Sequence, residues 1–413
     1  MKMFFNYPHA MVAAGALAMA LGSTVPAISA DETKETWRLF ITDQAEGLIT
    51  VVDPAKNSVL NRFSTLGYVT HLKPTESGKA LFAVQMDHDA VHVVETGIVL
   101  TDHGDHQDIE IKDAALLPTV IEGPRPVHAV MHDDKVLQFF DLDGEARVYT
   151  EKNLLEGSAE HKVVKTAAPH HGVVVPINDH FVVSEPNLDT ATPADKLPPR
   201  FGAKVVDNKG KQVGEVATCT GLHGEATSAG LVAFGCVEGV LVAQSDGSGP
   251  PNLELIEYSA DMPDGRVGTL VGGKALQFFL GDYGDDRLVL IEPSSDTPFR
   301  LVDLKIRDVH FVLDPIRVKY AYVFTEDGKL HALNVLSGEL VRSAQVTEPY
   351  SKDGHWRAPR PRLAVMGDLI AVTDPRESLV RLLDVNTFEE DRTIAIGGSP
   401  FNIVAIGGSG LQH

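Results

Sequence analysis

A short apolar strand pattern ending in an acidic or polar turn recurs eight times, and it constrains the fold more than any other feature of this chain. The repeats begin roughly 40 to 55 residues apart, and each is followed by further short strand patterns. No helical period is visible after the first 30 residues. The recurring segments are RLFITD (38–43), KALFAVQMD (79–87), KVLQFFD (135–141), HFVVSE (180–185), LVAFGC (231–236), KALQFFLGD (274–282), YAYVFTED (320–327) and DLIAVTD (368–374).

Repetition at this period predicts one repeat architecture for the whole chain. Eight similar units of short strands predict an all-β fold with a single eight-bladed β-propeller, because a β-sandwich does not need eight equal units. The N-terminal unit lacks an innermost strand, whereas FNIVAIG (401–407) is an orphan strand near the C-terminus. We therefore predict that the C-terminal strand pairs with the N-terminal blade and closes the ring.

The first 30 residues have the pattern of a secretory signal peptide. Lys2 precedes a short apolar core, AMVAAGALAMALG, and small residues follow in VPAISA, with cleavage expected after Ala27 or Ala30. The apolar core is too short to span a bilayer, and no later stretch is apolar enough to do so. We expect residues 1–30 to be a cleaved leader and residues 31–413 to form the propeller, exported and without membrane insertion.

The formal net charge of the chain is -21. Such an acidic protein is disfavoured as a partner of nucleic acid or of an anionic membrane, because both carry negative charge. The charge is compatible with a cationic ligand, although acidity is also a common route to solubility.

Five of the eight units place a histidine at the start of the predicted innermost strand. With the strands of a blade named a to d from the axis outward, we call the face of the d–a and b–c loops the upper face. The first residues of strand a line the channel at this face. The five histidines are His71, His128, His171, His223 and His310, whereas the other units offer Gly268, Arg360 or Arg362, and Asn402.

A wet, polar channel mouth explains a single histidine, but five in one register favour a metal site. Imidazole suits zinc, copper, nickel or iron. His128, His171 and His223 come from three consecutive units, so we predict that these three share an ion, with Glu225 beside them. The b–c turns, Asp141 among them, add carboxylates to the same face.

The segment TDHGDHQDIE (101–110) lies in a long predicted c–d loop on the opposite, lower face. His103 and His106 are close enough to bind one ion from a bent loop, although HxxH is a weak motif and a flexible acidic loop is the alternative reading. The carboxylates that complete or orient such a set are Asp102, Asp105 and Asp108.

His132 extends the prediction of a second site. Four strand residues span about 13 Å, so His128 and His132 cannot share an ion. His132 lies near the lower end of its strand, on the side where the loop of His103 emerges. The sequence therefore predicts two metal sites, one on each face.

Cys219 and Cys236 are the two cysteines of the chain. In an oxidising compartment an even pair at short separation favours a disulfide, with a thiolate metal site as the alternative. A bridge would brace the loop that carries Leu222, His223 and Glu225.

Five segments together, DHGDH, PVHAVMHDDK, APHHGVVVP, CTGLHGEA and FGCVEGVLV, resemble the AztD family of periplasmic zinc metallochaperones. The resemblance covers essentially the whole chain after the leader. It implies a β-propeller, a periplasmic location, two bound zinc ions, and direct transfer of zinc to the solute-binding protein of a zinc-specific ABC importer. The matching positions are His103, His106, His128, His132, His171, His223 and Glu225, with Cys219 and Cys236 as the expected bridge.

One local difference is that DHGDH continues as QDIEI, without further histidines, which shifts part of the coordination onto carboxylates. Because zinc needs neutral imidazole, affinity is expected to fall below about pH 6. We expect a monomer.

The alternative is a metal-dependent propeller hydrolase or lyase, in which Glu225 beside His223 acts as the general base. Against an enzyme, no GxSxG nucleophile motif is present, and the two tryptophans, Trp37 and Trp356, do not make the repeated tryptophan motifs of quinoprotein propellers. A scaffold with incidental histidines is the remaining possibility. We predict a metal carrier and no enzymatic activity.

Overall fold

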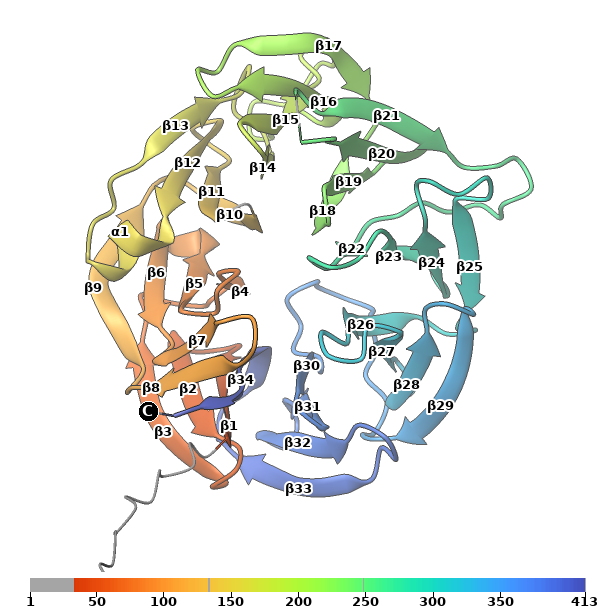
Figure 1. Cartoon of the computed structure of the whole chain (residues 1–413). Helices are drawn as coiled ribbons and strands as arrows, with labels where there is room; N and C mark the ends of the chain where they lie inside the picture. Colours follow the sequence, from red (N-terminus) through yellow and green to blue (C-terminus); the bar gives the residue numbers. More distant parts are fainter. Residues whose placement is uncertain (1–32, 133, 248, 413) are drawn as a thin grey trace, which may run out of the picture.

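The computed structural model describes residues 33–132, 134–247 and 249–412. The predicted signal peptide, residues 1–30, lies outside the described residues. Within these limits the strands form eight sheets, which stand around a central axis as the blades of a propeller (Figure 1). The predicted all-β, eight-bladed architecture is confirmed.

The strands are given blade by blade, from the axis outward. Blade 1 contains β34 (Pro400–Leu411), β1 (Thr33–Asp43), β2 (Leu48–Asp53) and β3 (Ser58–Ser64), and blade 2 contains β4 (His71–Pro74), β5 (Ala80–Gln85), β6 (Ala90–Glu95) and β9 (Ala115–Glu122). Blade 3 contains β10 (Pro126–His132), β11 (Lys135–Phe140), β12 (Glu145–Thr150) and β13 (Lys162–Lys165), and blade 4 contains β14 (Val174–Ile177), β15 (His180–Pro186), β16 (Arg200–Asp207) and β17 (Gln212–Thr218).

The second half of the ring has the same order. Blade 5 contains β18 (His223–Ser228), β19 (Leu231–Gly235), β20 (Gly239–Gln244) and β21 (Asn252–Glu257), and blade 6 contains β22 (Leu270–Val271), β23 (Phe279–Tyr283), β24 (Arg287–Ile291) and β25 (Phe299–Asp303). Blade 7 contains β26 (Asp308–Leu313), β27 (Tyr320–Thr325), β28 (Lys329–Asn334) and β29 (Glu339–Gln345), and blade 8 contains β30 (Leu363–Met366), β31 (Leu369–Asp374), β32 (Leu379–Asp384) and β33 (Glu390–Ala395).

Burial explains the two kinds of strand pattern in the sequence. Strand β5 is buried at every position, because both of its faces pack against neighbouring blades. The outer strand β29 alternates between exposed and half-buried residues, as expected where one face of a sheet meets solvent. The apolar cores therefore lie between adjacent blades, and the first residues of the inner strands are left to line the axis.

The ring closes through β34, the innermost strand of blade 1. It runs antiparallel to β1, with Leu39 opposite Ala405 and Phe40 opposite Val404. The strand at the C-terminal end therefore completes the N-terminal blade, which confirms the predicted closure.

The predicted c–d loop of blade 2 is a β-hairpin, formed by β7 (Ile98–Asp102) and β8 (Gln107–Ile111). Its apolar residues Ile98 and Ile109 are buried in the core between blades 1 and 2. Strand β8 also pairs with β34 in parallel, where Leu411 lies opposite Asp108. The expectation of a loop without regular structure was therefore wrong, because the short apolar runs on either side of the DHGDH turn pair with each other.

Helical structure is minor. Helix α1 (Glu151–Leu155) follows β12 with Thr150 as its N-cap, and the 3₁₀ turn η1 (Met86–His88) lies between β5 and β6. None of the helices in the described part of the chain has the length and apolar character that a membrane span requires.

Candidate metal centres

A cavity of about 1150 Å³ opens along the axis at the upper face. Its wall contains the five histidines that share one register in the sequence, because each lies at or near the start of an innermost strand. They are His71, His128, His171, His223 and His310. The ring therefore gathers side chains that are far apart in the chain into one enclosed space.

Three of these histidines form a row across blades 3, 4 and 5. The Nε2 atoms of His128 and His171 are 3.3 Å apart, and their ring centroids are 4.8 Å apart. The rings of His171 and His223 lie 6.3 Å apart, centroid to centroid. The structure thus places the three residues that the sequence grouped in one row. Among the described residues, however, the ligand atoms of this row do not all lie within 4.8 Å of one another, unlike those of the β7–β8 hairpin.

Glu225 reaches the same row through an irregularity in β18. A β-bulge shifts the register between His223 and Glu225, and Gly224 at its centre has a φ of +66°. A Cβ atom at this position would meet the carbonyl oxygen of Gly268 at 2.8 Å, so the bulge needs glycine. The carboxylate Oε2 of Glu225 lies 3.1 Å from Nδ1 of His128.

Outer partners set the tautomer of each imidazole in the row. His223 donates from Nδ1 to the carbonyl oxygen of Gly268 at 2.8 Å, since a carbonyl can only accept. His171 donates from Nδ1 to the carboxylate of Asp141, also at 2.8 Å. Each of these rings therefore keeps the lone pair on Nε2, the atom that lines the cavity and is available to a metal ion.

His128 completes the arrangement. Its Nδ1 faces the Glu225 carboxylate and its Nε2 faces Nε2 of His171, so two ring lone pairs meet at 3.3 Å when both rings are neutral. Two lone pairs repel at this distance unless a proton or a metal ion lies near both. Imidazoles held by carboxylates and carbonyls in this way are typical of histidine metal sites.

Electrostatics keep the groups of this row in their metal-binding protonation states. Burial lowers the pKa values of His171 and His223, which keeps both rings neutral. Burial alone would raise the pKa of Glu225, but the neighbouring His128 and Lys73 lower it to about 2, so the carboxylate is ionised. Neutral imidazole and ionised carboxylate are the forms that coordinate zinc.

His71 and His310 line the same cavity from blades 2 and 7. His310 accepts a hydrogen bond at Nδ1 from the backbone N–H of Leu363, at 3.0 Å, so the neutral ring carries its proton on Nε2. Burial, together with Lys73, lowers the pKa of His71 to about 3. His310 therefore presents a donor to the cavity, in contrast to His171 and His223.

A second cluster occupies the tip of the β7–β8 hairpin. The Nε2 atom of His103 lies 3.0 Å from Oδ2 of Asp108, and Nε2 of His106 lies 3.4 Å from Oδ1 of the same carboxylate. The two rings stack with centroids 5.0 Å apart. One ligand atom from each of the three residues lies within 4.8 Å of the others, a spacing that allows one ion to bind all three.

The other acids of this turn have supporting contacts. Asp102 accepts a hydrogen bond from the backbone N–H of Gly104 at 2.7 Å, which shapes the turn. Asp105 lies 2.8 Å from Nδ1 of His106 and orients that ring. Among the carboxylates named from the sequence, Asp108 is thus the one between both imidazoles, because β8 points it back toward the turn.

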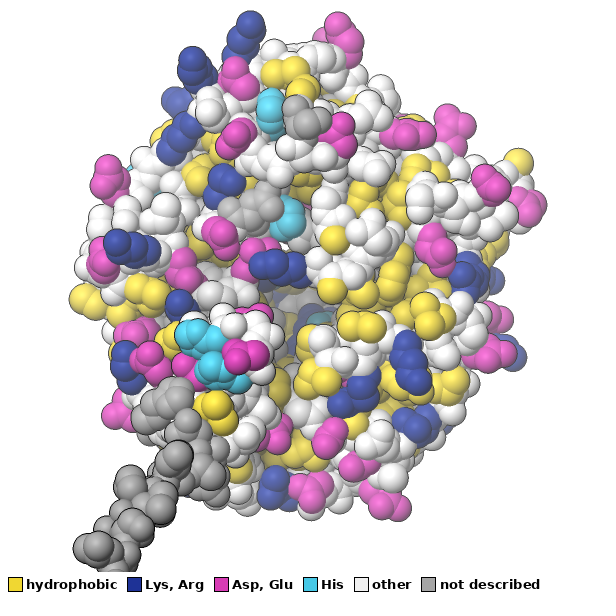
Figure 2. Space-filling view, viewed as in Figure 1, with side chains coloured by type: hydrophobic (Ala, Val, Ile, Leu, Met, Phe, Trp, Pro, Cys, Tyr) yellow, Lys and Arg dark blue, Asp and Glu magenta, His cyan; other side chains and the backbone are white. Residues whose placement is uncertain are grey.

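The hairpin cluster is open to solvent. The side chains of His103 and His106 are 46% and 39% exposed. Histidine side chains gather over the β7–β8 hairpin in Figure 2, beside the hollow at the centre of that face. A ligand group from another molecule can therefore reach this cluster directly.

His132 is buried at the lower end of β10, where its Nδ1 lies 3.4 Å from Oε1 of Glu76. Glu76 also approaches Lys274, at 3.7 Å. Among the described residues, the group whose ligand atoms are close enough to share one ion is His103, His106 and Asp108, without His132. Glu76 was not singled out from the sequence, since nothing in an acidic a–b loop marks it as the partner of a strand in the next blade.

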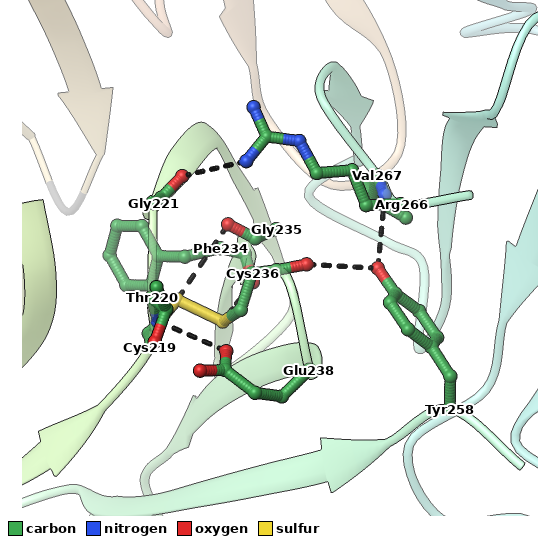
Figure 3. The surroundings of a disulfide bond; sticks show 10 residues. All are labelled: Cys219, Thr220, Gly221, Phe234, Gly235, Cys236, Glu238, Tyr258, Arg266 and Val267. Atoms are coloured by element: carbon green, nitrogen blue, oxygen red, sulfur yellow. Dashed lines mark hydrogen bonds between the residues drawn. A yellow bond between two sulfur atoms is a disulfide. The ribbon is translucent and has the colours of Figure 1, made fainter. Parts of the chain in front are cut away.

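The two cysteines form a disulfide with their Cα atoms 5.0 Å apart (Figure 3). The bridge joins the d–a loop before β18 to the b–c turn of blade 5. Around it, Thr220 donates its backbone N–H to Glu238, and Arg266 donates to the carbonyl of Gly221 at 3.4 Å. The predicted disulfide is confirmed and the thiolate metal site was wrong. The bridge braces the loop that delivers His223.

The chain is similar to known proteins in both sequence and structure. No protein-family model matches the chain. The zinc chaperone AztD of Citrobacter koseri is 44% identical over 395 residues, which cover 96% of this chain and 92% of that protein. A crystal structure of C. koseri AztD superposes with a TM-score of 0.87 at 43% identity, over 92% of this chain and 100% of that chain. A structure of apo AztD from the same organism superposes with a TM-score of 0.85 at 42% identity, over 91% of this chain and 99% of that chain.

Proposed function

This chain belongs to the AztD family of zinc chaperones, and we propose that it carries zinc in the periplasm and passes it directly to the solute-binding protein of a zinc ABC importer. Residues 1–30 serve as the cleaved leader for export, and residues 31–413 form the carrier, with zinc as its cargo. The observation that carries the proposal is the pair of oriented histidine clusters, one at each face of the ring.

The upper cluster is the storage site. The Nε2 atoms of His128, His171 and His223 coordinate the ion, while Asp141 and the Gly268 carbonyl hold two of the rings in the required tautomer. Glu225 holds His128 and supplies negative charge that offsets the charge of zinc. The enclosed position in the cavity keeps the ion away from competing ligands in solution.

The lower cluster is the transfer site. His103, His106 and Asp108 bind a second zinc ion at the exposed turn of the hairpin. An incoming histidine or carboxylate can take an open coordination position before the hairpin ligands leave, so that zinc moves by stepwise ligand exchange and is never free. The turn stands on a paired hairpin, so exchange depends on its exposure rather than on a long swinging loop.

A metal-dependent hydrolase or lyase is less well supported. Such an enzyme needs a general base near the metal in addition to its ligands. Glu225, the candidate for this role, lies 3.1 Å from Nδ1 of His128 and is engaged by that ring. The AztD family name also describes a chaperone.

The test is zinc stoichiometry and transfer. Elemental analysis of the purified protein should give two zinc ions per chain, and the variants H103A/H106A and H171A/H223A should each retain one. Mixing zinc-loaded protein with the acceptor in the presence of a chelator that captures free zinc should still load the acceptor. H103A/H106A should slow this transfer more than H171A/H223A does. Unchanged stoichiometry in either variant would remove the corresponding site from the proposal.

A further inference from the structure

The axial cavity is larger than one zinc ion requires. Its volume is about 1150 Å³, slightly above the range of roughly 300–1,000 Å³ that is typical of small-molecule pockets. The histidine row of blades 3 to 5 occupies one side of it. The rest of the wall includes residues of blades 2, 7 and 8, among them His71, Lys73, His310 and Arg362. Blade 2 adjoins the histidine row, and Lys73 also acts electrostatically on Glu225.

The charge of the cavity wall is opposite in sign to that of the protein. The chain has a formal net charge of -21. Among the described residues lining the cavity, six are lysine or arginine and one, Asp308, is acidic. The six basic residues are Lys73, Arg125, Lys352, Arg357, Arg360 and Arg362.

Four of these basic side chains are engaged by neighbouring groups of the protein. Arg125 pairs with Asp141 at 3.4 Å, Lys352 pairs with Asp308 at 3.5 Å, and Arg357 pairs with Asp87 through both Nη atoms. The guanidinium of Arg360 donates to backbone carbonyls, among them those of Ser351 at 2.7 Å and Asp353 at 3.0 Å. Three of the four thus pair with carboxylates, and the guanidinium donors of Arg360 are used by backbone carbonyls.

Lys73 and Arg362 differ from the other four. Arg362 donates from one Nη atom to the carbonyl of Val309 at 3.0 Å and lies against the ring of Phe401. Neither Lys73 nor Arg362 has an ion pair with a carboxylate in the described part of the chain. Arg362 is half-buried, so its unused donors face the cavity and are available to an anion.

The two cations and two histidines share one part of the cavity. Burial lowers the pKa values of His71 and His310, and Lys73 and Arg362 act electrostatically on both rings and lower these values further. His310 is therefore neutral and has its N–H on Nε2, since Nδ1 accepts from Leu363. This part of the wall thus presents an ammonium, the free donors of a guanidinium and an imidazole N–H.

We propose that Lys73, Arg362 and His310 form a binding site for a carboxylate in the axial cavity, beside the histidine row. The free Nε and Nη2 donors of Arg362 match the two oxygens of a carboxylate, while Lys73 contributes a point charge. The carboxylate belongs either to a small dicarboxylate or to an acidic side chain of a protein that docks at the upper face. Either ligand would lie beside the zinc-binding imidazoles and could share the ion.

The proposal does not depend on zinc, so it is tested first with metal-free protein. Isothermal titration with succinate, with neutral succinamide, with inorganic phosphate and with a glutamate-rich peptide compares the ligand classes. Saturable binding of succinate or of the peptide, without binding of succinamide, is expected. Binding of the peptide alone assigns the site to an acidic protein segment, and binding of succinate assigns it to small dicarboxylates.

The variants K73M and R362M should each weaken this binding by about tenfold or more, because each removes a charge-assisted hydrogen bond. The matched control is K209M, which removes a lysine from the exposed β16–β17 turn and should bind as the unchanged protein does. R362M should retain two zinc ions per chain, so that failure of the carboxylate site is distinguishable from failure of the zinc sites. If R362M does not fold, the affinity of K73M for the carboxylate ligands alone tests the proposal.

Three results would overturn the proposal: no saturable binding of succinate or peptide, equal affinity in K73M and K209M, or binding of phosphate alone.

Discussion

The nitrogen that carries the proton decides what each histidine of the cavity can do. His171 and His223 direct Nδ1–H outward to Asp141 and to the Gly268 carbonyl, and so keep Nε2 for a metal ion. His310 has the reverse tautomer, since its Nδ1 accepts from the backbone of Leu363. Histidines that are equivalent in the sequence are therefore different in function, and the difference comes from neighbouring blades.

The contact between Asp141 and His171 gives the first prediction. Asp141→Asn leaves an acceptor for Nδ1–H but removes its charge, so zinc affinity of the upper site should fall by about 10–100-fold while two ions are still bound at saturation. Competition with a chromophoric chelator measures this. Asp143→Asn, at a carboxylate that pairs with Arg147 on the surface, is the matched control and should leave affinity unchanged. A similar loss in both variants would show that Asp141 has no orienting role.

The pH dependence of the upper site is the second prediction at this scale. Burial lowers the pKa values of His171 and His223, so their neutral, metal-binding forms persist to lower pH than that of an ordinary imidazole near pH 6.5. Zinc affinity in an H103A/H106A background should fall on acidification, with its midpoint below pH 6.5. Chelator competition between pH 4.5 and pH 8 measures the midpoint. A midpoint at or above 6.5 would contradict the effect of burial.

At the scale of elements, the β7–β8 hairpin is a structure that the local sequence patterns did not predict. The sequence marked its two histidines and its acidic residues, and placed them on the correct side of blade 2. It did not reveal the hairpin, because β8 pairs with β34 at the other end of the chain. That pairing and the buried Ile98 and Ile109 fix the turn in which Asp108 meets both imidazoles.

The buried hairpin residue Ile109 carries the prediction for this element. Ile109→Ala should lower the free energy of unfolding by about 2–5 kcal/mol, because it leaves a cavity between blades 1 and 2. It should also weaken zinc binding at the lower site more than at the upper site. Urea unfolding and chelator competition provide the two readouts. Leu60→Ala, at an exposed position of β3, should change neither, and an equal effect of both substitutions would mean that the core contact of Ile109 does not support the hairpin.

For the whole molecule, the critical contact is the pairing of β34 with β1. Deleting the chain from Pro400 onward removes the inner strand of blade 1 and the support of β8 together. We expect loss of the near-ultraviolet circular dichroism of the native fold and aggregation on size-exclusion chromatography. Insertion of a glycine–serine pair after Gly210, in an exposed turn, should preserve both signals. A truncated chain with an unchanged melting temperature would show that closure does not stabilise the ring.

Part of the fold and of the candidate site could be predicted from the sequence alone. The eight blades were predictable because each unit contains its own strand and turn patterns, and closure was predictable from one orphan strand. The grouping of His128, His171 and His223 followed once the ring was assumed. Their orientation, the choice of Asp108 among the three predicted carboxylates and the positive cavity did not follow, because they depend on side chains that meet only after the blades are assembled. A net charge of -21 gives no indication that Lys73 and Arg362 face the axis together.

The parallel contact between Leu411 and Asp108 affects how the protein should be handled in the laboratory. It places the C-terminal strand beside a carboxylate of the lower cluster. A polyhistidine purification tag fused at that end would lie within reach of the same ion and would inflate any measured stoichiometry. A fluorophore attached there would instead report directly on zinc arriving at the hairpin and leaving it.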